Sequence, residues 1–400
     1  MDAVIVAAGR GTRMRPLTDT RPKPLLPVGE QTLLERLLTQ CAPLVDRLVL
    51  VVGYRDEAIR ERIGTEYAGT PVVYVEQSDR EGTADAVGQA ADIVEDRFLA
   101  LNADVVIDRS LLEQLIDTDG HAIATRTVED PESYGVIERR GTRLTGIHEK
   151  PTNPPTNRIN VGLYAFEPAV FDVIGDLAKS PRGEYELTDA IDRVVAEGDR
   201  VTVVDYDGPW LDVGRPWELL EATEVTLAEL DDRIEGTVEE GAHLSGPVVV
   251  EKGARIRSGS YIEGPVVIGA DADIGPNAYL RSGSVIGPNA RIGNSVEVKH
   301  SIVMADTSVG HLSYVGDSVL GADVNFGAGT MVANLRHDDR SIAVTVKGER
   351  VDTGRRKLGV IVGDRTKTGI NTSLNAGVVL GVGAKTKPGE TVLRDRPADR

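Results

Sequence analysis

Short apolar runs alternate with amphipathic stretches through the first half of the chain. Helical patterns over 32–41, 56–64 and 83–95 fall between runs that are typical of buried strands. This alternation predicts an α/β fold with a Rossmann-like, mainly parallel sheet covered on both faces. The predicted strands are residues 2–8, 47–53, 72–76, 98–104 and 121–128. Functional residues are expected beyond the carboxyl ends of these strands, where open α/β sheets place their sites.

After about residue 235 the pattern changes to an aliphatic residue at every sixth position. Neither the helical period of 3.6 nor simple strand alternation produces a period of six. A hexapeptide repeat predicts a parallel β-helix, in which each segment forms one flat side and its aliphatic side chain points inward. The in-phase residues are Val238, Leu244, Val250, Ile256, Ile262, Ile268, Ile274, Leu280, Ile286, Ile292 and Val298.

The repeat then slips and is interrupted. Its phase shifts after Val298, and a segment near 335–358 breaks it before it resumes at Val362. Two alternating runs around a Lys-Gly turn within that segment predict an inserted hairpin. We therefore predict one domain over 1–230 and a β-helix domain over 231–400.

Composition indicates the cellular compartment of the protein and the kinds of partner that it can bind. A formal net charge of −18 argues against a nucleic-acid backbone as a partner, because phosphates need a positive footprint. No apolar run approaches membrane-spanning length. The single cysteine, Cys41, rules out an intrachain disulfide and fits a reducing compartment, so we expect a cytoplasmic protein without a membrane partner.

A glycine-rich run follows the first predicted strand. It reads Gly9-Arg10-Gly11-Thr12-Arg13, and Arg-Pro-Lys-Pro-Leu-Leu-Pro-Val-Gly follows at 21–29. Two glycines let backbone N–H groups approach phosphate oxygens, and Arg13 and Lys23 add positive charge. The run lacks the third glycine of a dinucleotide-binding fingerprint and the Gly-Lys-Ser/Thr ending of a P-loop. It nevertheless favours phosphate binding.

This run resembles the signature of the sugar-1-phosphate nucleotidylyltransferases, and the resemblance continues across residues 1–230. It implies that a nucleoside triphosphate, UTP in our expectation, reacts with a sugar 1-phosphate. Gln77–Ala84 is similar to the family's base-recognition segment. The implied catalytic residues are Arg13 and Lys23. The implied nucleotide contacts are Gly9, Gly11, Thr12, Gln77, Gly82 and Thr83. The implied sugar contacts are Gly135, Glu149, Lys150 and Asn160.

Two aspartates are candidate magnesium ligands. Asp104 ends an apolar run, and Asp212 lies in Trp-Leu-Asp-Val-Gly, which resembles the family's second metal-binding segment. Magnesium prefers carboxylate oxygens together with substrate phosphates. An acidic residue after a strand can also cap a helix, so the prediction depends on the pair.

The β-helix carries a second candidate site. His311 lies in His-Leu-Ser-Tyr, and a histidine of near-neutral pKa suits a general base that removes a proton from an amine. Residues 296–334 resemble the acetyltransferase domain of bifunctional UDP-N-acetylglucosamine pyrophosphorylase / glucosamine-1-phosphate acetyltransferases, and the C-terminus resembles archaeal members. The resemblance implies a left-handed β-helix, a homotrimer, acetyl-CoA as co-substrate and His311 as the base. The other implied contacts are Arg281, Lys299, Tyr314, Asn325 and Asn334.

Two functions fit these motifs. The first is a bifunctional enzyme that makes a UDP-sugar, UDP-N-acetylglucosamine in our expectation, and acetylates glucosamine or galactosamine 1-phosphate. The second is a single-activity glucose-1-phosphate thymidylyl- or uridylyltransferase whose β-helix serves only assembly or regulation, because a β-helix alone does not imply catalysis.

Overall fold

The computed structural model describes residues 1–79 and 81–398, and these residues form two compact units. The chain passes between the units more than once near its N-terminus. The first unit comprises Met1–Arg10, Pro22–Leu25 and Leu33–Asp212, and the second comprises Gly11–Arg21, Leu26–Thr32 and Val213–Arg400. The domain boundary at residue 230 stays a prediction.

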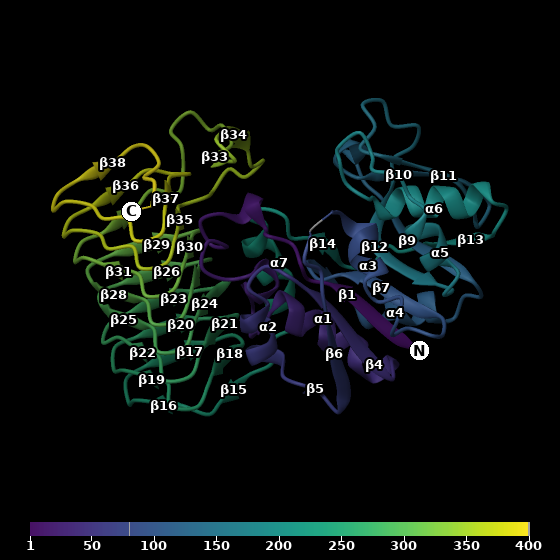
Figure 1. Cartoon of the computed structure of the whole chain (residues 1–400). Helices are drawn as coiled ribbons and strands as arrows, with labels where there is room; N and C mark the ends of the chain where they lie inside the picture. Colours follow the sequence, from purple (N-terminus) through teal and green to yellow (C-terminus); the bar gives the residue numbers. More distant parts are fainter. Residues whose placement is uncertain (80, 399–400) are drawn as a thin grey trace. The chain divides into compact units, whose positions relative to one another are not determined.

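A mixed sheet forms the framework of the first unit. Among the described residues its strand order is β10-β11-β13-β9-β12-β7-β1-β4-β6-β5. β1 pairs in parallel with β4 and β7, β4 with β6, and β9 with β13, while β12 runs antiparallel between β7 and β9 (Figure 1). The strands are β1 Asp2–Val6, β4 Arg47–Val52, β5 Glu66–Tyr67, β6 Thr70–Glu76, β7 Phe98–Asn102, β9 His121–Thr127, β10 Gly135–Arg140, β11 Arg143–Glu149, β12 Arg158–Phe166 and β13 Val201–Asp205.

Helices cover both faces of this sheet. Leu48 and Leu50 point into one apolar cluster and Val49 and Val51 into the other, which explains the continuous apolar run of β4. On the first face lie α1 Leu33–Cys41, α2 Asp56–Ile63 and α4 Arg109–Ile116. On the second lie α3 Thr83–Gly88, α5 Val170–Gly175 and α6 Leu187–Ala196. This layered arrangement confirms the predicted α/β fold.

One predicted helix is shorter than expected. The pattern over 83–95 predicts a single helix, but α3 ends at Gly88 and turns follow. Glycine gains little from a helix interior because its backbone loses the most conformational freedom there. A Cβ at Gly88 would also lie 3.0 Å from Cγ2 of Ile174 on α5. The glycine therefore ends the helix and lets α5 approach closely.

The second unit is dominated by a three-sided parallel β-helix. Val248 pairs with Val266 and Val266 with Ser284, a step of 18 residues, or three hexapeptides per coil. Up to the inserted hairpin each side takes every third strand, and Figure 1 shows these strands stacked. One side consists of β15 Arg233–Ile234, β18 Val248–Val250, β21 Val266–Ile268, β24 Ser284–Ile286, β27 Ile302–Val303, β30 Val319–Leu320, β35 Ile361–Val362 and β37 Val379–Leu380.

The other two sides repeat the same arrangement. The second side consists of β16 Thr237–Val238, β19 Arg255–Ile256, β22 Asp273–Ile274, β25 Arg291–Asn294, β28 Ser308–His311 and β31 Asn325–Phe326. The third consists of β17 His243–Ser245, β20 Tyr261–Glu263, β23 Tyr279–Arg281, β26 Glu297–Lys299, β29 Tyr314–Gly316, β32 Met331–Val332, β36 Ser373–Leu374 and β38 Thr391–Val392.

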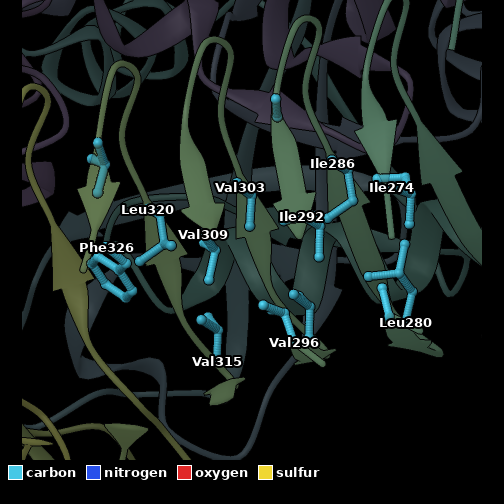
Figure 2. Close-up of a cluster of buried hydrophobic side chains, with 14 of the residues drawn as sticks. Ile274, Leu280, Ile286, Ile292, Val296, Val303, Val309, Val315, Leu320 and Phe326 are labelled. Carbon is cyan, nitrogen blue, oxygen red and sulfur yellow. The ribbon is translucent and has the colours of Figure 1, made fainter. Parts of the chain in front are cut away.

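The repeated aliphatic side chains form the interior of the β-helix. Figure 2 shows Ile274, Leu280, Ile286 and Ile292 among side chains stacked from coil to coil, and all four are fully buried. This stack confirms the β-helix predicted from the period of six. The phase slip after Val298 corresponds to a coil that is one residue shorter.

The shorter coil and the hairpin are visible in the strand register. Tyr279 pairs with Glu297, 18 residues later, but Glu297 pairs with Tyr314 after only 17. The inserted segment contains an antiparallel hairpin of β33 Ala343–Val346 and β34 Glu349–Asp352. Outside the coils, α7 Glu218–Leu227 places Leu227 against outward-facing valines of the first side, Val249, Val267 and Val285.

Candidate functional site

A lysine and two aspartates lie together in the first unit. Lys23 begins a short 3-10 turn, Lys23–Leu25, and its Nζ donates a hydrogen bond to Oδ2 of Asp104. The two side chains are 10% and 29% exposed. β8 Val105–Ile107 pairs with β14 Trp210–Asp212 so that Asp212 lies opposite Val105, the residue after Asp104. The structure thus gathers three predicted site residues where β7 ends.

The glycine turn continues into the second unit. Gly9 is exposed, and Gly11 has a φ of 59°, a left-handed conformation that glycine adopts without strain. The Thr18 hydroxyl donates to the Gly11 carbonyl at 2.8 Å, which closes the loop around the turn Thr12–Met14. Within the same unit, a Cβ at Gly214 would lie 3.0 Å from Nη2 of Arg13. The exposed Arg13 guanidinium therefore lies close to the Gly214 backbone and would have to shift if residue 214 carried a side chain.

The predicted base-recognition segment packs against the chain that leads into α6. Nε2 of the buried Gln77 donates to the Gly82 carbonyl at 3.1 Å and to Oδ2 of Asp85 at 2.6 Å. Gly82 has a φ of 128°, and a Cβ there would lie 2.3 Å from the Tyr185 carbonyl oxygen. The Leu187 N–H donates to the Thr83 hydroxyl oxygen at 3.0 Å. Arg80 of this segment lies outside the described residues.

Three of the predicted sugar contacts meet on β10, β11 and β12. Gly135 pairs with Glu149, and a Cβ at Gly135 would lie 3.2 Å from Oε2 of Glu149 and 3.6 Å from Cβ of Asn160. The Nζ of Lys150 lies 3.4 Å from Oε1 of Glu149. Gly135 therefore leaves space between a carboxylate and an amide, which suits the hydroxyl groups of a sugar.

A tight contact connects these residues to the end of β7, close to Asp104. Oδ1 of Asn160 accepts from the Gly162 N–H at 3.0 Å, and Nδ2 donates to Tyr164 Oη at 2.6 Å. Burial raises the pKa of Tyr164, so the phenol stays neutral and available as a hydrogen-bond partner. Gly162 has a φ of 79°, and a Cβ there would lie 2.4 Å from Nδ2 of Asn102. Asn102 ends β7, two residues before Asp104.

Three polar residues near this group were not predicted from the sequence. Nη2 of Arg182 lies 3.2 Å from Oε1 of Glu149 and 2.5 Å from Oε1 of the buried Glu186. A Cβ at Gly135 would lie 3.3 Å from Cγ2 of the buried Thr188. The available signal was the mostly polar stretch at 182–189, whose last residues begin α6 and for which no function was predicted.

In the β-helix, four predicted acetyltransfer residues lie on or beside the third side. Arg281 on β23 pairs with Lys299 on β26, which pairs with Gly316 on β29. Nη1 of Arg281 is 3.1 Å from Oε1 of Glu297. The Asn334 amide donates to Tyr314 Oη at 3.1 Å. Arg281, Lys299, Tyr314 and Asn334 thus form one polar group.

The remaining two predicted residues lie on the second side. His311 ends β28 and Asn325 begins β31, and both are exposed. The coil turns between them and the polar group, because Tyr314 follows His311 by three residues and already belongs to the third side. One chain therefore presents these six residues on two adjacent sides.

Known proteins match the chain over almost its whole length. The model for nucleotidyl transferases matches residues 2–229, and that for the GMPPB C-terminal domain matches residues 262–360. "Bifunctional protein GlmU" of Methanocaldococcus jannaschii is 42% identical over 99% of this chain and 95% of its own length. A "bifunctional sugar-1-phosphate nucleotidylyltransferase/acetyltransferase" of Sulfurisphaera tokodaii is 39% identical over 99% and 98%. The chain belongs to this bifunctional family.

Membership confirms the resemblance expected from the motifs. A solved structure described as a glucose-1-phosphate thymidylyltransferase of Bacillus anthracis is similar at a TM-score of 0.51 and 28% identity, over 56% of this chain and 95% of that chain. This likeness agrees with the nucleotidyltransferase fold of the first unit. Within the described part of the chain, no helix is long and apolar enough to span a membrane.

Proposed function

We propose that this protein forms UDP-N-acetylglucosamine and pyrophosphate from UTP and N-acetylglucosamine 1-phosphate, and acetylates glucosamine 1-phosphate with acetyl-CoA on its β-helix. The nucleotidyltransferase assignment rests on the contact of Lys23 with Asp104, beside Asp212. This contact places an ammonium group and two carboxylates together, and such charged groups can bind and neutralise the phosphates of a triphosphate and a sugar phosphate. UTP and the gluco sugar follow the motif resemblance. A cytoplasmic location stays a prediction, supported by a single cysteine.

Nucleotidyl transfer needs positioning and charge neutralisation rather than a covalent intermediate. An oxygen of the sugar 1-phosphate attacks the α-phosphorus, a new P–O bond forms, and the bond to pyrophosphate breaks in line. Lys23 brings positive charge to the phosphates, and the backbone at Gly9 offers a close approach. Gly11, Thr12 and Arg13 are triphosphate contacts by the motif resemblance. The space beside Gly135, Glu149 and Asn160 suits the sugar.

Asp104 and Asp212 are the proposed ligands of Mg²⁺. Their carboxylates fit this ion, which takes one or two protein carboxylates and completes its shell with water and substrate phosphates. The described residues contain no group of three or more His, Cys, Asp and Glu that would form an all-protein metal site. When bound, the ion supplies charge neutralisation at phosphate oxygens. Lys23, which hydrogen bonds to Asp104, would add a second positive charge beside these carboxylates.

Acetyl transfer needs a base for the amine. His311 would take a proton from the amino group of the sugar while the nitrogen of that amino group attacks the thioester carbonyl. The CoA thiolate then leaves. Arg281 and Lys299 would pair with the sugar phosphate. By the resemblance, Tyr314 and Asn325 contact the amino sugar, and Asn334 contacts acetyl-CoA. Because one chain presents these residues on two sides, a second copy of the β-helix would complete the site.

By the motif resemblance, we propose that the assembly is a homotrimer. Light scattering during gel filtration should give a mass of about three times the 42.9 kDa of the chain. A monomer with full acetyltransferase activity would contradict the shared site.

Pyrophosphate release from a panel of UTP, dTTP and sugar 1-phosphates tests the first activity. Asp104→Asn should lower turnover on the order of 10²-fold or more. The substitution removes a carboxylate that is a proposed ligand of the Mg²⁺ ion, and the ion neutralises the reacting phosphates. Asp96→Asn is a matched control, since Asp96 is an exposed aspartate just before the opposite end of β7. Normal turnover by Asp104→Asn would remove the mechanism.

Thiol release from acetyl-CoA with glucosamine or galactosamine 1-phosphate tests the second activity. His311→Ala should lower it by about 10²–10⁴-fold, the usual contribution of a general base. His243→Ala is the control, because His243 is exposed on β17 in an early coil. If the wild-type protein releases no thiol with any amino-sugar phosphate, the β-helix serves assembly or regulation and the single-activity alternative holds.

A further inference from the structure

A buried aspartate connects two residues of the proposed acetyltransfer site, Lys299 and Asn334. Asp317 follows β29, and its side chain is only 5% exposed. Its φ of 50° is left-handed, a conformation that aspartate tolerates better than most residues. Its N–H donates to the Lys299 carbonyl at 2.9 Å, and its carbonyl accepts from the Gly359 N–H at 2.8 Å. The coils on either side therefore hold its backbone in place.

The carboxylate contacts three side chains. Oδ2 accepts hydrogen bonds from Lys299 Nζ at 3.2 Å and from Asn334 Nδ2 at 2.5 Å. Oδ1 lies 3.1 Å from Nδ1 of His300. Lys299 is a proposed contact of the sugar phosphate, and Asn334 is a proposed contact of acetyl-CoA. A single carboxylate oxygen thus binds one proposed contact of each substrate.

The charge state of Asp317 suits this arrangement. Burial raises its pKa, but the hydrogen bond from His300, the positive charge of Lys299 and the hydrogen bond from Asn334 outweigh burial, and the net pKa is lowered. The group is therefore anionic near neutral pH. A carboxylate accepts from all of its neighbours, whereas a neutral amide would direct a donor at one of them.

His300 limits the rotation of the carboxylate. Its ring approaches Oδ1 with Nδ1, while Nε2 lies 3.7 Å from Oε2 of Glu224 on α7. His300 itself has a left-handed φ of 44°, and a Cβ at Gly283 would lie 2.7 Å from its Cδ2. With Oδ1 engaged by this confined ring, Oδ2 is turned toward Lys299 and Asn334.

We propose that Asp317 is a positioning residue for acetyl transfer, which holds Lys299 in place to bind the sugar phosphate and Asn334 in place to bind acetyl-CoA. The proposal rests on the proposed acetyltransferase function. A flexible lysine loses conformational freedom when it binds a phosphate, and its contact with Asp317 removes part of that freedom beforehand. Asp317 itself touches neither reacting atom.

The test compares steady-state kinetics of Asp317→Asn with the wild-type protein. The asparagine keeps the size of the side chain but turns an amide donor toward other donors, so Lys299 and Asn334 are displaced. KM for both the amino-sugar phosphate and acetyl-CoA should rise about 10-fold, with a much smaller change in kcat, because binding contacts common to ground and transition states are lost. Pyrophosphate release should be unchanged.

Asp323→Asn is the matched control. Asp323 has the same left-handed conformation, with a φ of 53°, at an exposed corner of the same β-helix. It should leave both KM values at the wild-type level. A lower kcat with unchanged KM values in Asp317→Asn would mean that less protein is folded, and would overturn the positioning role.

Substitutions of His300 keep the proposal testable if Asp317→Asn folds poorly. His300→Ala should raise both KM values, whereas His300→Gln, which can still donate to Oδ1, should stay close to the wild-type protein. Equal kinetics for both variants would overturn the proposal. If the wild-type protein itself shows no acetyl transfer, the proposed function fails and this inference fails with it. If the wild-type protein is active and Asp317→Asn keeps both KM values, the inference alone fails.

Discussion

At the scale of single residues, the candidate sites depend on positions where only a small or left-handed residue fits. Gly82 and Gly162 both have positive φ, and a Cβ at either would collide with Tyr185 or Asn102. Asp317 shows the same constraint in the β-helix, where a left-handed backbone directs a carboxylate toward three side chains. Conformation at these positions decides which polar groups can meet.

Gly135→Ala tests the proposed sugar site. The added methyl group would crowd Glu149, Thr188 and Asn160, so KM for the sugar 1-phosphate should rise several-fold while KM for the nucleotide changes little. Pyrophosphate-release kinetics with each substrate varied in turn provide the measurement. Gly146→Ala on β11 is the control, because its Cβ would come no closer than 3.9 Å to a neighbouring atom. Equal effects of the two substitutions would argue against a sugar site here.

The lowered pKa of Asp317 predicts a change in acid stability. An aspartate whose pKa is lowered on folding stabilises the protein above its unfolded pKa of about 3.9, and this contribution is lost as the pH falls through the folded value. In thermal unfolding, the melting temperature of the wild-type protein should therefore be well above that of Asp317→Asn at pH 6. The difference between the two melting temperatures should narrow toward pH 3. Lys299, His300, Asn334 and Tyr314 surround the carboxylate and are the same in both proteins. A gap independent of pH would contradict the assigned charge.

At the scale of elements, the two units gain stability in different ways. The sheet of the first unit is buried on both faces, so contacts between distant segments hold it together. Each coil of the β-helix contacts mainly the coils next to it, so its stability is close to a sum of local terms. These local contributions to stability come from the aliphatic side chains stacked in the interior, which Figure 2 shows.

Ile286→Ala tests this stack. Ile286 is fully buried and pairs with Ile268 on one side and Val303 on the other. Removing its side chain should lower the free energy of unfolding by about 2–5 kcal/mol, the usual cost of a large-to-small core substitution. Denaturant unfolding followed by circular dichroism measures the loss. Val238→Ala in the first coil, where the side chain is 36% exposed, should cost less than about 1 kcal/mol.

At the scale of the whole molecule, charge is the dominant property. A formal net charge of −18 destabilises any compact state through self-repulsion, although it favours solubility. Many of the acidic groups pair with arginine, as Asp273 does with Arg257 on the β-helix, but the excess stays uncompensated. Screening by salt should therefore stabilise this protein.

Raising KCl from about 0.1 M to about 1 M at pH 7 should raise the melting temperature, because the screening length falls from about 10 Å to about 3 Å. The same comparison near pH 5, close to the isoelectric point of about 4.9, serves as the control and should show a smaller rise. A melting temperature that falls with KCl at pH 7 would show that attractive ion pairs outweigh the net repulsion.

Local pattern was enough to predict most of the architecture. The strands and helices around the parallel part of the sheet, the β-helix and the hairpin all follow from periods of two, 3.6 and six, which near neighbours in the chain determine. The helix over 83–95 was predicted too long, because Gly88 and its contact with Ile174 end it early. The motifs also identified Lys23, Asp104 and Asp212 as candidates for one site.

Only the tertiary structure decided which polar residues meet. Lys23 reaches Asp104 across 81 positions, and the shorter coil stacks Asp317 next to Lys299 and Asn334. Contacts of this kind depend on strand order and on the number of residues per coil, and residue patterns do not encode them locally. For the same reason Arg182, Thr188 and Asp317 had no assigned role until the fold placed them beside residues that the motifs had already indicated.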